Sequence, residues 1–174
     1  MASAAVLPGS HLMWCWCRTR TRSSVLRMDL HALEDLKRLK YRYLRTLDQK
    51  QWDDFGETLA PEATADYGPA LAFVGRSTIV EFMRSSLGAE IITEHHVGHP
   101  EIEIDGDTAT GTWYLQDVVI ARSQRMILRG AAFYEDRYAR STEGAWRITH
   151  TGYQRSYEYW VSLDDLPSLK FTQP

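Results

Sequence analysis

Cysteine is almost absent from this sequence, and the few cysteines are confined to one end. Among the 174 residues there are two, Cys15 and Cys17. From residue 18 onward no cysteine is left for a structural disulfide, a cysteine zinc site or a cysteine nucleophile. This usage fits a reducing compartment, so we expect a cytoplasmic location.

Long apolar runs and the familiar nucleotide and hydrolase motifs are also missing. No stretch approaches the roughly 18 consecutive apolar residues that a membrane helix needs, so we expect no membrane partner. The sequence has no Gly-rich phosphate loop, no GxSxG motif and no HExxH motif. These absences argue against the enzyme classes that those motifs mark.

Basic side chains are scarce over most of the chain. Twenty Lys and Arg against 23 Asp and Glu give a formal net charge of −3, but four of the arginines lie within residues 1–27. The rest of the chain therefore carries 16 basic and 23 acidic side chains. An acidic body argues against nucleic-acid binding, because that affinity comes from clustered Lys and Arg.

Residues 1–27 differ from the rest of the chain. Pro8 interrupts the first apolar stretch and the arginines follow it, which is the reverse of a secretory signal. The Arg- and Ser-rich composition is closer to a transit peptide, but Arg18, Arg20 and Arg22 do not build one basic helix face. We expect a disordered extension outside the fold, with an upstream start codon and a targeting role both open.

The following residues, 28–160, fit one domain with helices first and strands after. Apolar residues at three- and four-residue steps predict a helix over 29–47 with Asp29 as N-cap. The other expected elements are helices over 52–59 (ended by Pro61) and from Ser77 to about Gly88, a short strand over 63–67, and strands over 91–96, 101–104, 108–120, 125–138 and 145–155. This order predicts an α+β fold in which helices cover one face of a curved antiparallel sheet, with residues 161–174 as a C-terminal tail.

A histidine cluster is the first candidate for chemistry. His95 and His96 are adjacent in a predicted strand, so their side chains face opposite ways and do not readily share a metal. We therefore expect no metal site. One of the two is a candidate general acid or base, because imidazole titrates near neutral pH. A surface pair at a strand end is the alternative.

Four further side chains are candidates on position alone. Asp48 ends the first predicted helix, where a carboxylate opposes the helix dipole, so it either caps the next helix or pairs with an imidazole. Tyr43 lies on the apolar helix face and is either core or functional, and Tyr67 precedes a Gly-Pro turn. Arg155 reaches the cavity if its strand contains a bulge, most obviously at Gly152, or if the second face of that strand lines the cavity. Otherwise it is a surface arginine paired with an acid.

Together these patterns resemble the nuclear transport factor 2-like superfamily of cone-shaped α+β folds. Within it the chain is most similar to the SnoaL-like branch that includes the bile acid 7α-dehydratases. The resemblance covers residues 29–160 and is carried by KYRYLRTLDQKQWDDFGETLAP, EFMRSSL, PEIEIDGDTATGTWYLQD, GAAFYEDRY and WRITHTGYQR.

The resemblance implies a catalytic set. It falls on Tyr43, Asp48, Tyr67, His95 and Arg155. Ungapped counting from Tyr43 would select His96, but the following Pro-Glu-Ile anchors the histidine at His95, which we adopt. We expect the substrate to be contacted by Phe73, Phe82, Trp113 and Tyr114.

The implied activity is that of a dehydratase without metal or organic cofactor. It would remove water from a hydroxylated steroid-like or polycyclic carbonyl compound, with His95 as base, Asp48 as its orienting carboxylate and the tyrosines as donors. The resemblance also implies a homo-oligomer, a trimer first and a dimer second. A SnoaL-like cyclase, a ketosteroid-type isomerase and a non-catalytic ligand-binding module are the alternatives.

Overall fold

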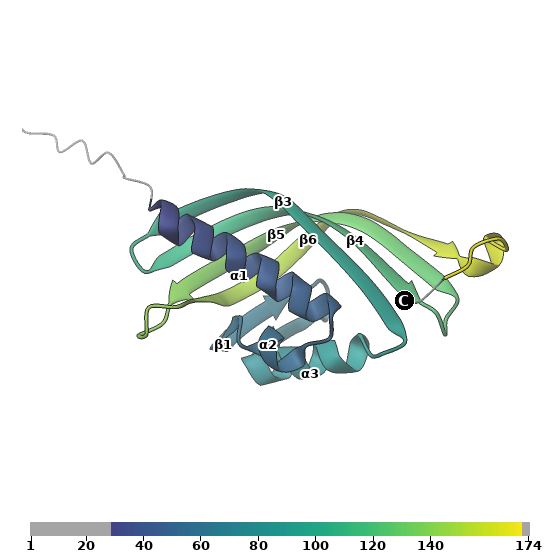
Figure 1. Ribbon diagram of the computed structural model, residues 1–174, viewed down its shortest axis with the longest axis horizontal. Helices are drawn as coiled ribbons and strands as arrows, with labels where there is room; N and C mark the ends of the chain where they lie inside the picture. Colours follow the sequence, from purple (N-terminus) through teal and green to yellow (C-terminus); the bar gives the residue numbers. More distant parts are fainter. Residues whose placement is uncertain (1–28, 172–174) are drawn as a thin grey trace, which may run out of the picture.

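The computed structural model describes residues 29–171, which form helices packed against the concave side of one curved sheet (Figure 1). The α+β class expected from the sequence is confirmed. In chain order the elements are α1 (Leu30–Asp48), α2 (Trp52–Gly56), β1 (Leu59–Asp66), β2 (Ala72–Val74), α3 (Arg76–Ser86), β3 (Ile91–Asp105), β4 (Thr108–Ala121), β5 (Met126–Arg140), β6 (Trp146–Ser162) and a 3₁₀ turn, Leu163–Asp165.

The sheet has the strand order β2-β1-β6-β5-β4-β3. All neighbouring strands are antiparallel except β1 and β6, which run parallel. The expected sheet was antiparallel throughout. The exception arises because β1 and β6 lie far apart in the sequence, and a long connection permits a parallel pairing that a hairpin does not.

Several expected boundaries are wrong. The first strand begins at Leu59, the last continues to Ser162, and β2 was not expected. The strands expected over 91–96 and 101–104 form one strand, β3, in which His99 takes a φ of 51° and the register shifts between Gly98 and Glu101. The N-cap of α3 is Gly75 (φ 92°), which has no side-chain cap bond, rather than Ser77. The second helix ends at Gly56 instead of residue 59, and Leu59 is already the first residue of β1.

Pro61 therefore lies inside β1 instead of after a helix. It falls where the pairing of β1 with β6 is interrupted, between Leu59 and Thr64. A proline cannot donate to a strand ladder, and an interruption of this kind is one of the few places where a sheet accepts it.

Helix α1 places the site because it lies across the sheet (Figure 1). The Asp29 carboxylate accepts hydrogen bonds from the backbone N–H of His31 and Ala32, both at 3.1 Å, which confirms the expected N-cap. The buried face of α1 meets the buried side chains of the central strands, among them Trp113 and Ile148. The helix C-terminus is thereby directed at β3.

The ends of the chain are only partly described. The expected disorder of residues 1–27 lies outside the described residues. At the other end β6 continues to Ser162, and Leu163 is buried with its N–H donating to the carbonyl of Arg125 at 2.8 Å. Within residues 29–171 no helix is long and apolar enough to cross a membrane.

A buried ion pair joins α1 to β5. Lys40 Nζ lies 2.7 Å from Asp136 Oδ2, and neither side chain has any solvent exposure. The same ammonium lies 3.4 Å from the ring centroid of Tyr134. The Tyr138 hydroxyl donates to Asp136 Oδ2 at 2.8 Å, and the same hydroxyl accepts from Trp113 Nε1 at 2.9 Å. Burial lowers the pKa of Lys40, and Asp136 opposes this effect.

We expect Lys40→Met to destabilise the fold by about 3–5 kcal/mol, because it leaves the Asp136 carboxylate buried without its cation. Urea unfolding of the purified protein measures the loss. Arg38→Met is the matched control, since Arg38 forms an exposed pair with Glu34, and exposed pairs contribute at most about 1 kcal/mol. Equal stabilities of the two variants would contradict the assigned role of the buried pair.

Candidate active site

The C-terminus of α1 and the first half of β3 bring a carboxylate and an imidazole together. Asp48 Oδ1 lies 2.6 Å from His95 Nδ1, and the backbone N–H of His95 donates to Asp48 Oδ2 at 2.9 Å. Thr93 Oγ1 donates to Asp48 Oδ1 at 2.8 Å. The His95 side chain is 11% exposed and that of Asp48 22%. Asp48 thus pairs with an imidazole and does not cap α2, whose N-cap is Gln51.

These contacts set the charge state of the carboxylate. Burial alone would raise the pKa of Asp48, but the side chain and backbone of His95 and the Thr93 hydroxyl together lower it below its ordinary value. Lys50 adds a cation, because its Nζ donates to Thr93 Oγ1 at 3.0 Å. Lys50 has a φ of 58°, a conformation that is rare for a residue with a Cβ. Thr93 and Lys50 were not among the residues expected from the sequence.

The two adjacent histidines face opposite sides of the sheet, as expected for neighbours in a strand. His95 faces α1, whereas His96 is exposed and borders a surface depression with Glu94, Tyr157 and Tyr159. Of the two histidines, only His95 is hydrogen-bonded to Asp48.

Tyr43 and Tyr67 form a second pair. Their hydroxyl groups lie 2.9 Å apart. Tyr43 has no exposure and Tyr67 is 8% exposed, so Tyr67 is the outer member. Burial raises the pKa of both phenols well above the ordinary value. Both therefore stay protonated at neutral pH and one donates to the other.

Arg155 is bound to an acid that sequence reasoning missed. Its Nη1 and Nη2 lie 2.6 and 2.7 Å from the two carboxylate oxygens of Asp117, which is buried in β4. Asp117 pairs across the sheet with His95, so the two share a face. The sequence left open whether Arg155 faces the interior or pairs with an acid at the surface, and in the structure it faces inward and is also paired with an acid.

A bulge explains how Arg155 comes to face inward, but it is not at Gly152. The pairing of β5 with β6 shifts between Arg137–His150 and Tyr138–Ile148, which leaves one extra residue in β6 at Thr149. Alternation along β6 changes phase there, so that Arg155 lies on the same face as Ile148. Gly152 is needed for another reason: a Cβ at this position would lie 2.7 Å from the carbonyl of Asp66.

The four aromatic residues expected to contact substrate do not lie together in the structure. Phe73 and Phe82 are half-buried and stack at 4.3 Å, with Phe73 6.3 Å from the ring of Tyr67. Trp113 is fully buried and bonded to Tyr138. Tyr114 lies on the opposite face, 5.3 Å from Phe133. Phe73 and Phe82 are thus the pair adjoining the tyrosines.

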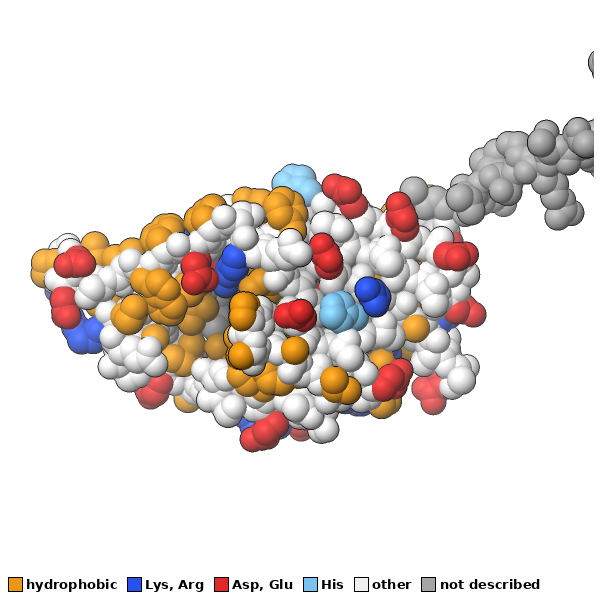
Figure 2. Space-filling model, turned by 180° about the vertical axis from the view of Figure 1, so that it is seen from behind, with side chains coloured by type: hydrophobic (Ala, Val, Ile, Leu, Met, Phe, Trp, Pro, Cys, Tyr) orange, Lys and Arg blue, Asp and Glu red, His pale blue; other side chains and the backbone are white. Residues whose placement is uncertain are grey.

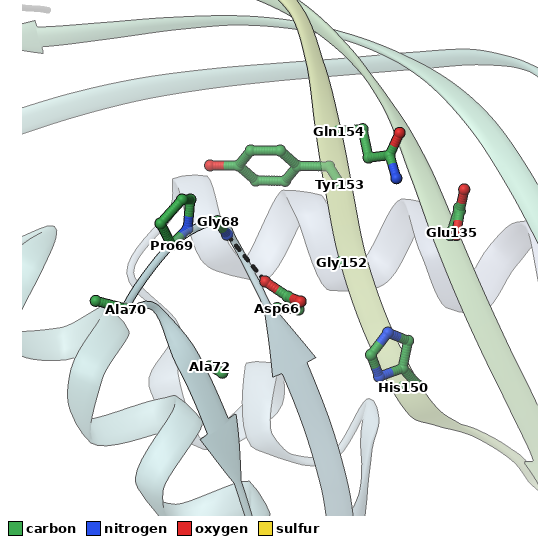
Figure 3. Close-up of a pocket in the computed structure, with 10 residues that line it drawn as sticks. All are labelled: Asp66, Gly68, Pro69, Ala70, Ala72, Glu135, His150, Gly152, Tyr153 and Gln154. Atoms are coloured by element: carbon green, nitrogen blue, oxygen red, sulfur yellow. Dashed lines mark hydrogen bonds between the residues drawn. The ribbon is translucent and has the colours of Figure 1, made fainter.

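A cavity of about 480 Å³ adjoins this region, and His95 is not among the residues that line it (Figure 3). It is lined from the β1–β2 turn, where Gly68 N–H donates to Asp66, and from β6, including His150 and Tyr153. The Tyr153 ring lies 5.6 Å from that of Tyr67, and the Arg155 guanidinium 4.8 Å from the Tyr153 ring. Tyr153 therefore connects Arg155 to the tyrosine pair. No group of three potential metal ligands is found among residues 29–171.

Comparison with known proteins gives the family. The model of the SnoaL-like domain matches residues 28–152. The uncharacterized protein Rv2910c of Mycobacterium tuberculosis is 26% identical over 134 residues, covering 76% of this chain and 90% of that protein.

Solved structures show the same fold. A putative scytalone dehydratase from Novosphingobium aromaticivorans superposes with a TM-score of 0.69 at 15% identity, covering 75% of this chain and 87% of that one. The hexachlorocyclohexane dehydrochlorinase LinA-type3 from Novosphingobium barchaimii gives 0.71 at 14% identity, covering 83% and 97%. The expected nuclear transport factor 2-like fold and SnoaL-like branch are confirmed.

The lowered pKa of Asp48 predicts how its contribution to stability varies with pH. The difference in free energy of unfolding between wild type and Asp48→Asn should be fully present above about pH 5. It should shrink as the pH falls below about 4, where the carboxylate takes up a proton in the unfolded chain before it does so in the native protein. Urea unfolding from acid to neutral pH measures it. Asp53→Asn, at an exposed carboxylate, is the control. A difference for Asp48→Asn that stays constant over this range would contradict the account.

Proposed function

We propose that this chain, which belongs to the SnoaL-like domain family, is a lyase that works without a cofactor. Its reaction would be the elimination of water from a hydroxylated steroid-like or polycyclic carbonyl compound. The catalytic residues would be Tyr43, Asp48, Tyr67, His95 and Arg155. Bile acid-like steroids are the first substrates to test.

The observation that carries this proposal is the hydrogen bond of 2.6 Å between His95 Nδ1 and Asp48 Oδ1. With Nδ1–H held by the carboxylate, Nε2 of the neutral imidazole is left to accept a proton from a C–H next to a carbonyl. The same carboxylate stabilises the imidazolium that results. A positioned base of this kind contributes about 10²–10⁴ in rate.

The tyrosine pair would supply the acid side of the reaction. Tyr67 is the outer hydroxyl and adjoins Phe73, so it would donate to the enolate oxygen or the departing hydroxyl. Tyr43 has no exposure and would act through its bond to Tyr67. Phe73 and Phe82 would contact the ring system of the substrate.

Two of the compared proteins support the reaction class by their names. One is a putative scytalone dehydratase and the other a hexachlorocyclohexane dehydrochlorinase, and both names describe an elimination. An elimination needs a base for a carbon-bound proton and a donor for the leaving group, and the two pairs described above provide both.

We further propose that the protein is cytoplasmic and forms a homo-oligomer, with a trimer as the first expectation and a dimer as the second.

The test is incubation of the purified protein with hydroxylated ketosteroids and polycyclic hydroxy-ketones, read by mass spectrometry as loss of water. Exchange of deuterium into the substrate without water loss would indicate an isomerase or cyclase instead. Binding without any reaction would indicate a ligand-binding module.

The two histidines provide matched variants. His95→Ala should lower kcat by about two to four orders of magnitude, because the base is lost. His96→Ala should keep kcat within about tenfold of wild type, because His96 lies on the other face of the sheet and is not positioned to act as the base. If His96→Ala is the damaging variant, the base is misassigned, and if neither matters, the His–Asp pair is structural.

Asp48→Asn should also be severely impaired. An amide carries no charge to stabilise the imidazolium, and it does not select the Nδ1–H tautomer of neutral His95 as the carboxylate does. The double variant with His95→Ala should be little worse than His95→Ala alone, as for residues that act as one unit. Steady-state kinetics of the four proteins measures this. Additive losses would show that the two residues act separately.

Activity should survive exhaustive chelation. The proposed mechanism uses only protein acids and bases, and no group of three metal ligands is found in the part of the chain that the structure describes. The measurement compares turnover before and after dialysis against a chelator. Loss of activity that returns with added zinc would overturn the cofactor-free mechanism.

A further inference from the structure

Arg155, which lies on the same face of the sheet as His95, is already paired with carboxylates. Arg155 meets both oxygens of Asp117 in a bidentate contact, and its Nε lies 3.4 Å from Glu158 Oε2. The Asp117 side chain is 3% exposed, whereas that of Glu158 is 46% exposed. All three nitrogens of this guanidinium therefore face carboxylates, one of them buried.

The remaining charges around His95 are mostly negative. The carboxylates are Asp48, Asp117 and Glu158. Besides Arg155 the cation here is Lys50, which donates to the Thr93 hydroxyl, and that hydroxyl donates to Asp48. A negatively charged ligand would thus meet more acids than bases.

The backbone is shaped to let the buried pair form. Gly130 of β5 pairs with Asp117, directly beneath the contact. A Cβ at this position would lie 2.6 Å from Arg155 Nη1 and 3.2 Å from Asp117 Oδ1. Only glycine leaves room for the guanidinium at this point.

The same face is apolar further along the strands. Cross-strand pairs place Val119, Leu128 and Trp160 in one row beyond Asp117, and Trp160 is 51% exposed. This row of apolar side chains fits a ring system better than a charged group. Figure 2, a view from behind, shows that hydrophobic side chains gather on the left part of the molecule, with several charged ones among and around them.

We propose that Asp117 is a specificity-determining residue: by occupying Arg155 it makes the site take uncharged ring compounds and reject anionic ones. A carboxylate, sulfonate or phosphate could bind Arg155 only by displacing Asp117, which would leave a buried carboxylate without a cation. A neutral carbonyl or hydroxyl leaves the pair intact. The inference rests on the proposed function for the location of the site, and it narrows the substrate to neutral molecules.

Two fluorescent probes that share one skeleton test this without knowledge of the substrate. N-phenyl-1-naphthylamine is neutral, and 8-anilino-1-naphthalenesulfonate adds a sulfonate to the same rings. The wild type should bind the neutral probe about tenfold or more tightly than the sulfonate, because like charges brought together are unfavourable. Fluorescence titration gives both dissociation constants.

Asp117→Asn should reverse this preference. It keeps the shape of the side chain but frees the charge of Arg155, so affinity for the sulfonate should rise about tenfold or more while that for the neutral probe changes little. Glu158→Gln is the matched control, because it removes an equal charge beside the same guanidinium where solvent screens it, and it should change either affinity by less than about threefold. Circular dichroism checks that each variant is folded.

If Asp117→Asn does not fold, Gly130→Ala takes its place, since the added methyl displaces the guanidinium without removing a charge. The proposal is overturned if the wild type binds the sulfonate as tightly as the neutral probe, if it binds neither probe, or if neither variant shifts the preference. A protein that eliminates water yet prefers the sulfonate would keep the proposed function and refute this inference alone.

Discussion

The functional geometry depends on the contact between the last residue of α1 and the first half of β3. A carboxylate at a helix C-terminus interacts unfavourably with the helix dipole, which destabilises the helix by about 0.3–1 kcal/mol. At Asp48 this is offset by hydrogen bonds from the His95 ring, the His95 backbone and the Thr93 hydroxyl. Three donors fix both oxygens of the carboxylate, and the carboxylate in turn fixes the imidazole. Without that contact the sheet would present His95 with no defined orientation.

The position of α1 is itself fixed by buried polar groups. Lys40 and Asp136 tie the middle of the helix to β5, and Tyr43 one turn later bonds to Tyr67 of the segment after β1. Asp117 and Arg155 join β4 to β6 across Gly130. Each buried charge has an opposite charge within hydrogen-bond distance, as a low-dielectric interior demands. The largely apolar interior of this fold thus contains several paired polar groups.

Much of this was predictable from single residues. Asp29 before an apolar periodicity predicted the helix start, and alternation in β4 and the adjacency of His95 and His96 predicted which side chains share a face. The missed residues are charged groups on apolar stripes. Lys40 follows Leu36 by four residues on the buried face of α1, and Asp117 continues the alternation of Trp113 and Leu115. Periodicity marks such positions as buried but does not identify the partner, which comes from a distant strand. The bulge at Thr149 was missed because no Gly or Pro adjoins it, whereas Gly98 and Pro100 around His99 indicated a break between two strands rather than a bulge within one.

The central claim is that Asp48 accepts a hydrogen bond from His95 Nδ1–H, so that the neutral imidazole carries its proton on Nδ1 and leaves Nε2 to accept one. Long-range ¹H–¹⁵N correlation spectra of ¹⁵N-labelled protein at about pH 8, where an unperturbed imidazole is neutral, observe this tautomer directly. His95→Gln identifies the resonance. The account predicts the Nδ1–H tautomer for His95 in the wild type and its loss in Asp48→Asn. A proton on Nε2 in the wild type would contradict it.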